Sequence, residues 1–168
     1  VSPAGWGVPA LMEALDSGTR PPLAELSRER ARMLHEASAR HEGKPPVRDI
    51  LEALFAPPLR WASLENDRRI SVQFIIRARS EGTADMREVL KNDVSHLARF
   101  ADALVAARPD LPKEDVYWRL HFVLGMVHNN RFAEFDRLHH LSGGITREAD
   151  VDGLLRRMLD FAEAGFSA

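Results

Sequence analysis

Two pairs of a carboxylate and a histidine, each separated by two residues, are the strongest chemical motifs in the chain. They are Asp93 with His96 and Asp136 with His139. Side chains three residues apart share one face of a helix, and paired sets of this kind hold di-metal centres in helical bundles. Both pairs lie off the apolar stripes of their predicted helices, so they point away from a bundle interior. We therefore expect no metal site and keep a helical-bundle metalloenzyme as an alternative.

Other catalytic chemistry has little support in the sequence. The chain has no cysteine, which excludes thiolate catalysis, disulfides and cysteine zinc sites. It has no glycine-rich phosphate loop and no nucleophilic serine motif. With 23 Lys and Arg against 25 Asp and Glu, the formal net charge of -2 disfavours DNA binding by these residues. We expect a protein that is not an enzyme and has no cofactor.

Two prolines offer binding chemistry instead. Pro57 and Pro58 interrupt a helical pattern, and each removes the N–H that would bond the carbonyl four residues earlier, on Ala53 and Leu54. These carbonyls could face a ligand in a kinked helix, or the kink could be an ordinary one satisfied by water.

Histidines and arginines add two further expectations. His121 and His128 lie two turns apart on an aromatic stripe, where they could bond a polar ligand head or be satisfied core or interface histidines. One helix is rich in basic residues, and we expect these to form a solvated face with Glu25 and Glu29. The basic residues are Arg28, Arg30, Arg32 and Arg40.

The elements that position these groups are helices in one all-α domain of 168 residues. Proline and glycine clusters divide the chain into about six helical blocks. Residues 70–76 alternate like a strand, but a lone strand has no partner, so we predict a short helix there. The other predicted helices cover 23–40, 47–64, 83–109, 112–141 and 147–166, the last capped by Thr146. No apolar run is long enough to span a membrane and no signal peptide is visible, so we expect a cytoplasmic protein without a membrane partner.

The helix predicted over 112–141 has two stripes, at about 100° per residue. One is aliphatic: Val116, Leu120, Val123, Leu124, Val127 and Leu138. The other is aromatic: Tyr117, Trp118, His121, Gly125, His128 and Phe132. A surface helix needs one apolar stripe, so this helix must be covered on two sides. Gly125 weakens a helix, which a close approach by another backbone or a ligand would offset.

The segment DVYWRLHFVLG at 115–125 resembles the C-terminal regulatory domain of TetR/AcrR-family transcriptional regulators, closest to a subgroup that includes fatty-acid-responsive repressors. The segment DILEALFAPPL at 49–59 is also similar to that subgroup's proline-containing helix. The order of helical blocks from Leu11 to Phe166 agrees with the family.

The resemblance implies an effector-binding and dimerisation domain of a repressor, whose last two long helices form a four-helix bundle in a homodimer. The family's N-terminal helix-turn-helix is missing, so operator DNA would be bound only through that missing domain. Residues 1–20 would be a remnant of the junction, and 21–168 the ligand-binding and dimerisation domain. A ligand-free dimeric interaction scaffold is a further alternative.

The predicted sites follow from this assignment. The expected ligand lining is mostly apolar, which favours a hydrophobic or acyl-chain small molecule. Its residues are Leu54, Phe55, Trp61, Phe74, Leu97, Phe100, Trp118, His121 and Phe122. The expected dimer interface consists of Leu124, Val127, His128, Leu155 and Met158.

Overall fold

The computed structural model describes residues 22–63, 72, 84–129, 134–146 and 150–168. Within these residues the regular structure is helical, which confirms the predicted all-α class. The six helices are α2 (Pro22–Arg40), α3 (Val47–Ala62), α5 (Ala84–Ala107), α6 (Lys113–Asn129), α7 (Glu134–Leu141) and α8 (Val151–Ser167). None of them is both long enough and apolar enough to cross a membrane. The predictions for 1–20 and, apart from helical Val72, for 70–76 lie outside the described residues.

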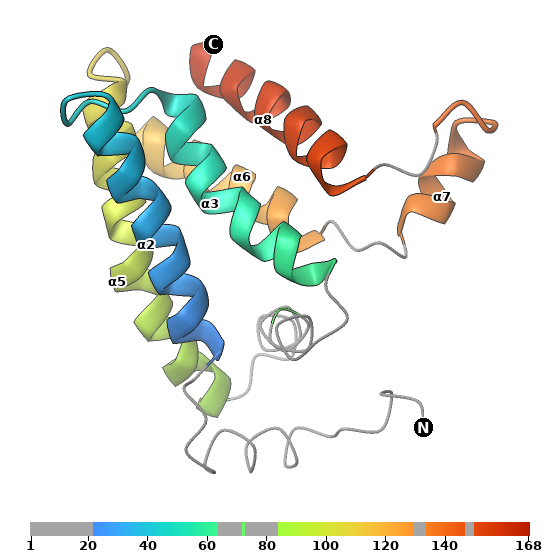
Figure 1. The fold of residues 1–168 in the computed structure, drawn as a ribbon, viewed down its shortest axis with the longest axis horizontal. Coiled ribbons are helices and arrows are strands. Elements are labelled where there is room, and N and C mark those ends of the chain that lie inside the picture. Colours follow the sequence, from blue (N-terminus) through green and yellow to red (C-terminus); the bar gives the residue numbers. More distant parts are fainter. Residues whose placement is uncertain (1–21, 64–71, 73–83, 130–133, 147–149) are drawn as a thin grey trace.

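Helix α3 lies at the centre of the domain. All its residues from Ala53 to Leu59 are buried, including both prolines, and the helix continues across them. A helix that is apolar on every side must be covered on every side. It packs against α2, α5, α6 and α8. Figure 1 shows it running diagonally between the α2–α5 pair and α8. The side chains of α3 therefore connect all the large helices into one core.

A tight turn fixes α2 against α3. Glu42 and Gly43 have positive φ angles, and the Gly43 N–H donates to the Ser38 carbonyl at 2.8 Å. This is the helix-ending pattern in which glycine adopts the left-handed conformation at little cost. The side chains of Arg40 and His41 both contact the Asp49 carboxylate, at 3.2 and 2.9 Å, across the turn. Short local bonds thus set the angle at which α2 meets the central helix.

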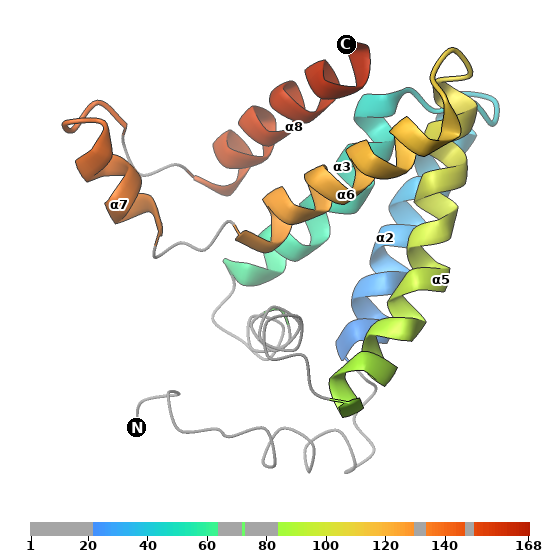
Figure 2. The same ribbon diagram turned by 180° about the vertical axis from the view of Figure 1, so that it is seen from behind.

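Helices α6 and α8 run side by side in opposite directions, as Figure 2 shows. The predicted stripe of α8 is buried, with Leu155, Met158 and Ala162 each less than 6% exposed. The helix starts later than predicted, because its cap is Asp150 and not Thr146. The Asp150 carboxylate accepts the Gly153 N–H at 2.5 Å, which satisfies a donor that the first turn would leave unpaired.

The single helix predicted over 112–141 is wrong. The structure contains two helices in this range, α6 ending at Asn129 and α7 starting at Glu134. Asparagine is a poor helix former, and two of them, Asn129 and Asn130, stand where α6 ends. Figures 1 and 2 show α7 projecting away from the other helices. Leu138, which was assigned to the stripe of Val116, is 45% exposed on α7 as a result.

Candidate functional site

Four of the nine residues expected to line a ligand site lie inside the domain. Leu54, Phe55 and Phe100 are 0% exposed, and Trp61 is 5% exposed. Leu54, Phe55 and Phe100 belong to one continuous core cluster, and the half-buried Leu97 packs against it. Phe74 lies outside the described residues. The interior part of the expected lining is therefore apolar and comes from α3 and α5.

The other three expected lining residues lie on the surface of α6. Trp118 and Phe122 are 55% and 62% exposed, and His121 is exposed as well. Their rings form one aromatic cluster, with neighbouring centroids 6.0 Å apart and Trp118 stacked on Phe122. Within one chain this cluster does not face the same space as Leu54.

Helical geometry explains this separation. The inner face of α6 carries Val116, Leu120 and Val123, which are 0–6% exposed. At about 100° per residue, Trp118 lies roughly opposite Val116 on the helix. The two stripes of the sequence are both present, but the aliphatic stripe faces the chain's own core and the aromatic stripe faces outward.

Three of the five residues expected at a dimer interface also lie in the core. Val127, Leu155 and Met158 are 6%, 5% and 4% exposed. Leu124 is half-buried, and the side chain of His128 lies outside the described part of the chain. Since Val127, Leu155 and Met158 pack inside the chain itself, they are not available to contact a second copy directly.

The outward faces of α6 and α8 carry the exposed aromatic residues instead. Tyr117 on α6 is 53% exposed, and Phe161 on α8 is 73% exposed. Gly125 lies on the same side of α6 as Trp118, and a Cβ built on it would meet no atom within 4 Å. The close approach expected at Gly125 therefore does not come from the described residues of the same chain. An exposed aromatic surface of this kind is typical of an interaction site.

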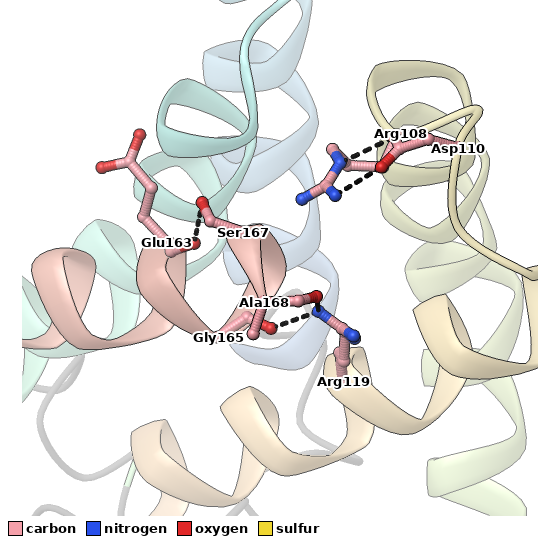
Figure 3. A network of polar contacts seen from close by, with 7 residues as sticks. All are labelled: Arg108, Asp110, Arg119, Glu163, Gly165, Ser167 and Ala168. Atoms are coloured by element: carbon pink, nitrogen blue, oxygen red, sulfur yellow. Dashed lines mark hydrogen bonds and ion pairs between the residues drawn. The ribbon is translucent and has the colours of Figure 1, made fainter.

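One arginine side chain connects α6 with α8. Arg119 on α6 donates to the carbonyl oxygens of Gly165 and Ala168 at 2.5 and 2.9 Å (Figure 3). A cation at a helix C-terminus satisfies carbonyls that have no helical partner and interacts favourably with the helix dipole. These contacts join α6 to the end of α8.

A surface ion pair lies near this junction, also drawn in Figure 3. Arg108 contacts Asp110 at 2.6 and 2.9 Å. The hydrogen bond from Arg108 lowers the pKa of the Asp110 carboxyl to about 2. The pair closes the turn between α5 and α6, and Asp110 keeps its negative charge over the whole physiological pH range.

A second arginine, Arg48, links α3 to α8. Arg48 contacts Glu163 at 2.8 Å and Asp160 at 2.9 Å. The pKa of Arg48 is raised mainly by the hydrogen bond that it donates to Glu163, and also by the one that it donates to Asp160. Arg48 is about one-third exposed and Asp160 is well exposed, so we assign these contacts a role in fixing the register of the two helices and little net stability.

The sequence pattern placed Arg30 on the wrong face of its helix. It was expected on a solvated face of α2, but it is only 3% exposed. Its Nε donates to the Leu54 carbonyl oxygen at 2.9 Å. That carbonyl has no helical donor, because the residue four positions later is Pro58. A side chain of α2 therefore bonds the Leu54 carbonyl, and the sequence analysis did not expect this partner.

The neighbouring arginine behaves as expected. Arg32 lies on the outer face of α2 and forms ion pairs with Glu29 and Glu36 at 2.8 and 2.5 Å.

The two carboxylate and histidine pairs were considered as possible metal ligands. Among the residues that the structure describes, no group of three or more potential metal ligands comes together.

Comparison with known proteins gives one match. The family model for the tetracyclin repressor-like C-terminal domain matches residues 52–165. No curated protein and no solved structure gives a significant match. The matched residues begin within α3 and extend almost to the end of α8, so they include most of the core and the exposed aromatic residues of α6 and α8.

Proposed function

The chain belongs to the tetracyclin repressor-like C-terminal domain family, and from this we propose that it binds a hydrophobic effector and pairs with a second copy in a transcriptional repressor. Domains of this family are parts of transcriptional regulators that generally dimerise and bind small-molecule effectors. The observation that carries the proposal is the exposed aromatic surface formed by α6 and α8. It gives the domain a defined place at which a second copy can bind.

The dimer would form through the aromatic surface. Trp118, Phe122 and Phe161 are each more than half exposed, on two neighbouring antiparallel helices. A two-fold axis would place the same two helices of the second copy against them, which makes a four-helix bundle. The open position at Gly125 would allow an aromatic side chain of the partner to approach the α6 backbone closely.

A charge substitution on this surface tests the dimer. Trp118→Glu and Phe161→Glu should each convert the dimer into a folded monomer, because a carboxylate buried at the interface has no counter-charge. Val94→Glu is the matched control. Val94 is an apolar residue on α5, away from this surface, and its exposed fraction of 67% is similar to those of Trp118 and Phe161. Sedimentation equilibrium measures the mass and circular dichroism the fold. A monomeric unaltered chain, or a Trp118→Glu dimer as tight as the Val94→Glu dimer, would exclude this interface.

The effector would bind among the interior residues. Leu54, Phe55, Trp61 and Phe100 offer apolar side chains from α3 and α5, which favour a ligand with an acyl chain or another hydrophobic body. A small molecule that prefers one arrangement of the helices would shift the population of the dimer without making or breaking a bond. DNA binding would belong to a separate helix-turn-helix domain of a cytoplasmic regulator.

Native mass spectrometry of the purified chain tests both halves of the proposal together. We expect the mass of a dimer with a hydrophobic small molecule retained on it. Leu97→Trp should abolish retention and leave the dimer mass unchanged, because Leu97 packs against the interior cluster and not on the aromatic surface. A dimer that retains no ligand from cell extract or from added fatty acids would favour the interaction scaffold.

A further inference from the structure

A charged residue precedes the exposed aromatic side chains on each of the two outward faces. On α6, Glu114 lies four residues before Trp118, which lies four residues before Phe122. On α8, Arg157 lies four residues before Phe161. Residues four apart lie on one side of a helix, and all five of these residues are exposed. Each outward face therefore begins with a charge, which is acidic on α6 and basic on α8.

Neither charge has an ionic partner among the residues that the structure describes. Arg157 donates from Nη1 to the Gly153 carbonyl oxygen at 3.2 Å, one turn earlier in α8. This bond uses one nitrogen of an exposed guanidinium, so the charge stays at the surface. Arg48, in contrast, is paired with two carboxylates of α8. A second copy of the chain can therefore supply the partner for Glu114 and for Arg157.

The two charges lie at opposite ends of the aromatic surface. Helices α6 and α8 are antiparallel, as Figure 2 shows, and Arg119 donates to the carbonyl oxygens of Gly165 and Ala168. Because both helices rise by about 1.5 Å per residue, Arg157 is level with a point about nine residues beyond Arg119 along α6. Glu114 lies more than one turn before Arg119. The charges are thus about 20 Å apart along the helix direction, with the aromatic side chains between them.

A two-fold axis through the middle of the aromatic surface and perpendicular to the helices exchanges its two ends. Glu114 of one copy is then level with Arg157 of the other, and the same contact occurs twice in the dimer. An axis parallel to the helices would keep each end level with itself, so the two Glu114 carboxylates would share one end and the two Arg157 guanidiniums the other. Complementary charges fix the orientation and register of an interface, which favours the first arrangement.

We propose that Glu114 of one copy and Arg157 of the other form an ion pair at each edge of the aromatic surface, and that these pairs set the direction in which two copies associate. This inference rests on the proposed function and adds the residues that recognise the second copy. The aromatic side chains supply most of the affinity, because an exposed charge pair contributes little. The ion pairs discriminate between the two orientations and against chains that lack this charge pattern.

Two charge-reversed variants of the full chain test this pairing when they are mixed. Glu114→Arg places two arginines together at both edges of its own dimer, and Arg157→Glu places two glutamates there. Each homodimer should therefore be at least about tenfold weaker in sedimentation equilibrium than the dimer of the unaltered chain. A one-to-one mixture restores an acidic and a basic residue at both edges, so the mixed dimer should dominate in native mass spectrometry.

Arg156→Glu is the matched control for these variants. Arg156 is exposed on α8 but does not lie in line with Phe161, so its reversal should leave the affinity of the dimer unchanged. A loss of affinity as large as that of Arg157→Glu would show an effect of net charge and overturn the specific pair. Circular dichroism checks the fold of each variant.

The outcomes separate this inference from the proposed function. A monomeric unaltered chain overturns the proposed dimer and the ion pair together. If the chain dimerises and Trp118→Glu disrupts the dimer, but the mixture gives no excess of mixed dimer, the aromatic interface stands and the ion pair is overturned. If a reversed variant does not fold, Glu114→Gln serves in its place. Added NaCl should then weaken the unaltered dimer more steeply than the Glu114→Gln dimer, and equal salt dependence would overturn the proposal.

Discussion

The contact between Arg30 and Leu54 can be tested in a double-mutant cycle with Pro58. Leu54 is fully buried, and its carbonyl oxygen accepts a hydrogen bond from Arg30, which lies 24 positions earlier in the sequence. In the chain as it stands, Arg30→Met leaves this carbonyl without that donor. In a Pro58→Ala background, the new alanine N–H can form the ordinary helical bond to the same oxygen, because α3 is helical on both sides of position 58.

The magnitude follows from this difference. A buried acceptor that loses its partner costs about 1–3 kcal/mol. This cost applies to Arg30→Met in the parent chain and is absent when the alanine of the Pro58→Ala variant supplies a donor. The effects of removing a buried charge and of reducing the proline ring occur in both backgrounds and cancel in the cycle. We expect Arg30→Met to be less destabilising in the Pro58→Ala background by about 1–2 kcal/mol.

Urea unfolding followed by circular dichroism gives the four free energies of unfolding. All four proteins are compared at one protein concentration, because dimerisation makes the stability depend on it. A parallel cycle with Arg28→Met should be additive, since Arg28 is exposed. If the Arg30 and Pro58 substitutions are additive within about 0.5 kcal/mol, the proline does not create the acceptor that Arg30 occupies, and our explanation of the buried arginine is refuted.

Leu155→Asp should unfold the domain, at a cost of about 3 kcal/mol or more, because Leu155 is 5% exposed; a folded, soluble monomer in sedimentation would contradict its core position. Gly125→Ala should stabilise α6 by about 1 kcal/mol in urea unfolding and yet weaken the dimer in sedimentation, and an unchanged dimer would place Gly125 outside the interface. Asp110 has a folded pKa of about 2, lowered by Arg108, so its stabilising contribution is complete above about pH 4 and is lost as the pH falls through 2. Arg108→Gln should return the Asp110 pKa in an NMR titration to its usual value near 4, and a pKa that stays near 2 would rule out Arg108 as the cause.

The first two described helices were predictable because their boundaries are set by local chemistry. The predicted ranges 23–40 and 47–64 correspond to α2 (Pro22–Arg40) and α3 (Val47–Ala62). Gly43, Pro45 and Pro46 stand between them, and glycine just after a helix and proline just before one are common end and start signals.

The assignment of faces on α6 was not predictable from spacing. The sequence places an aliphatic and an aromatic stripe on this helix, and either could face the chain's own core. Only the packing of α3 and α8 against α6 decides that Val123 lies inside and Phe122 outside. The residues predicted for the ligand site and for the dimer interface are therefore divided between the core and the outer face of α6, and spacing alone could not show this division.

Arg30 shows what further signal the sequence contains. It was grouped with its neighbours Arg28 and Arg32, which share its charge but not its face of the helix. Position 30 is four residues after Leu26 and four before Leu34, so the helical spacing alone places its guanidinium in the core stripe. A buried guanidinium needs an acceptor, and prolines inside a helix create one at a known distance of four residues. Pro58 and Arg30 should accordingly be treated as one unit: the proline supplies the acceptor that holds the arginine, and the arginine makes the interrupted helix tolerable in the core. A substitution at either position should then depend on the residue at the other, which no inspection of one helix at a time would reveal.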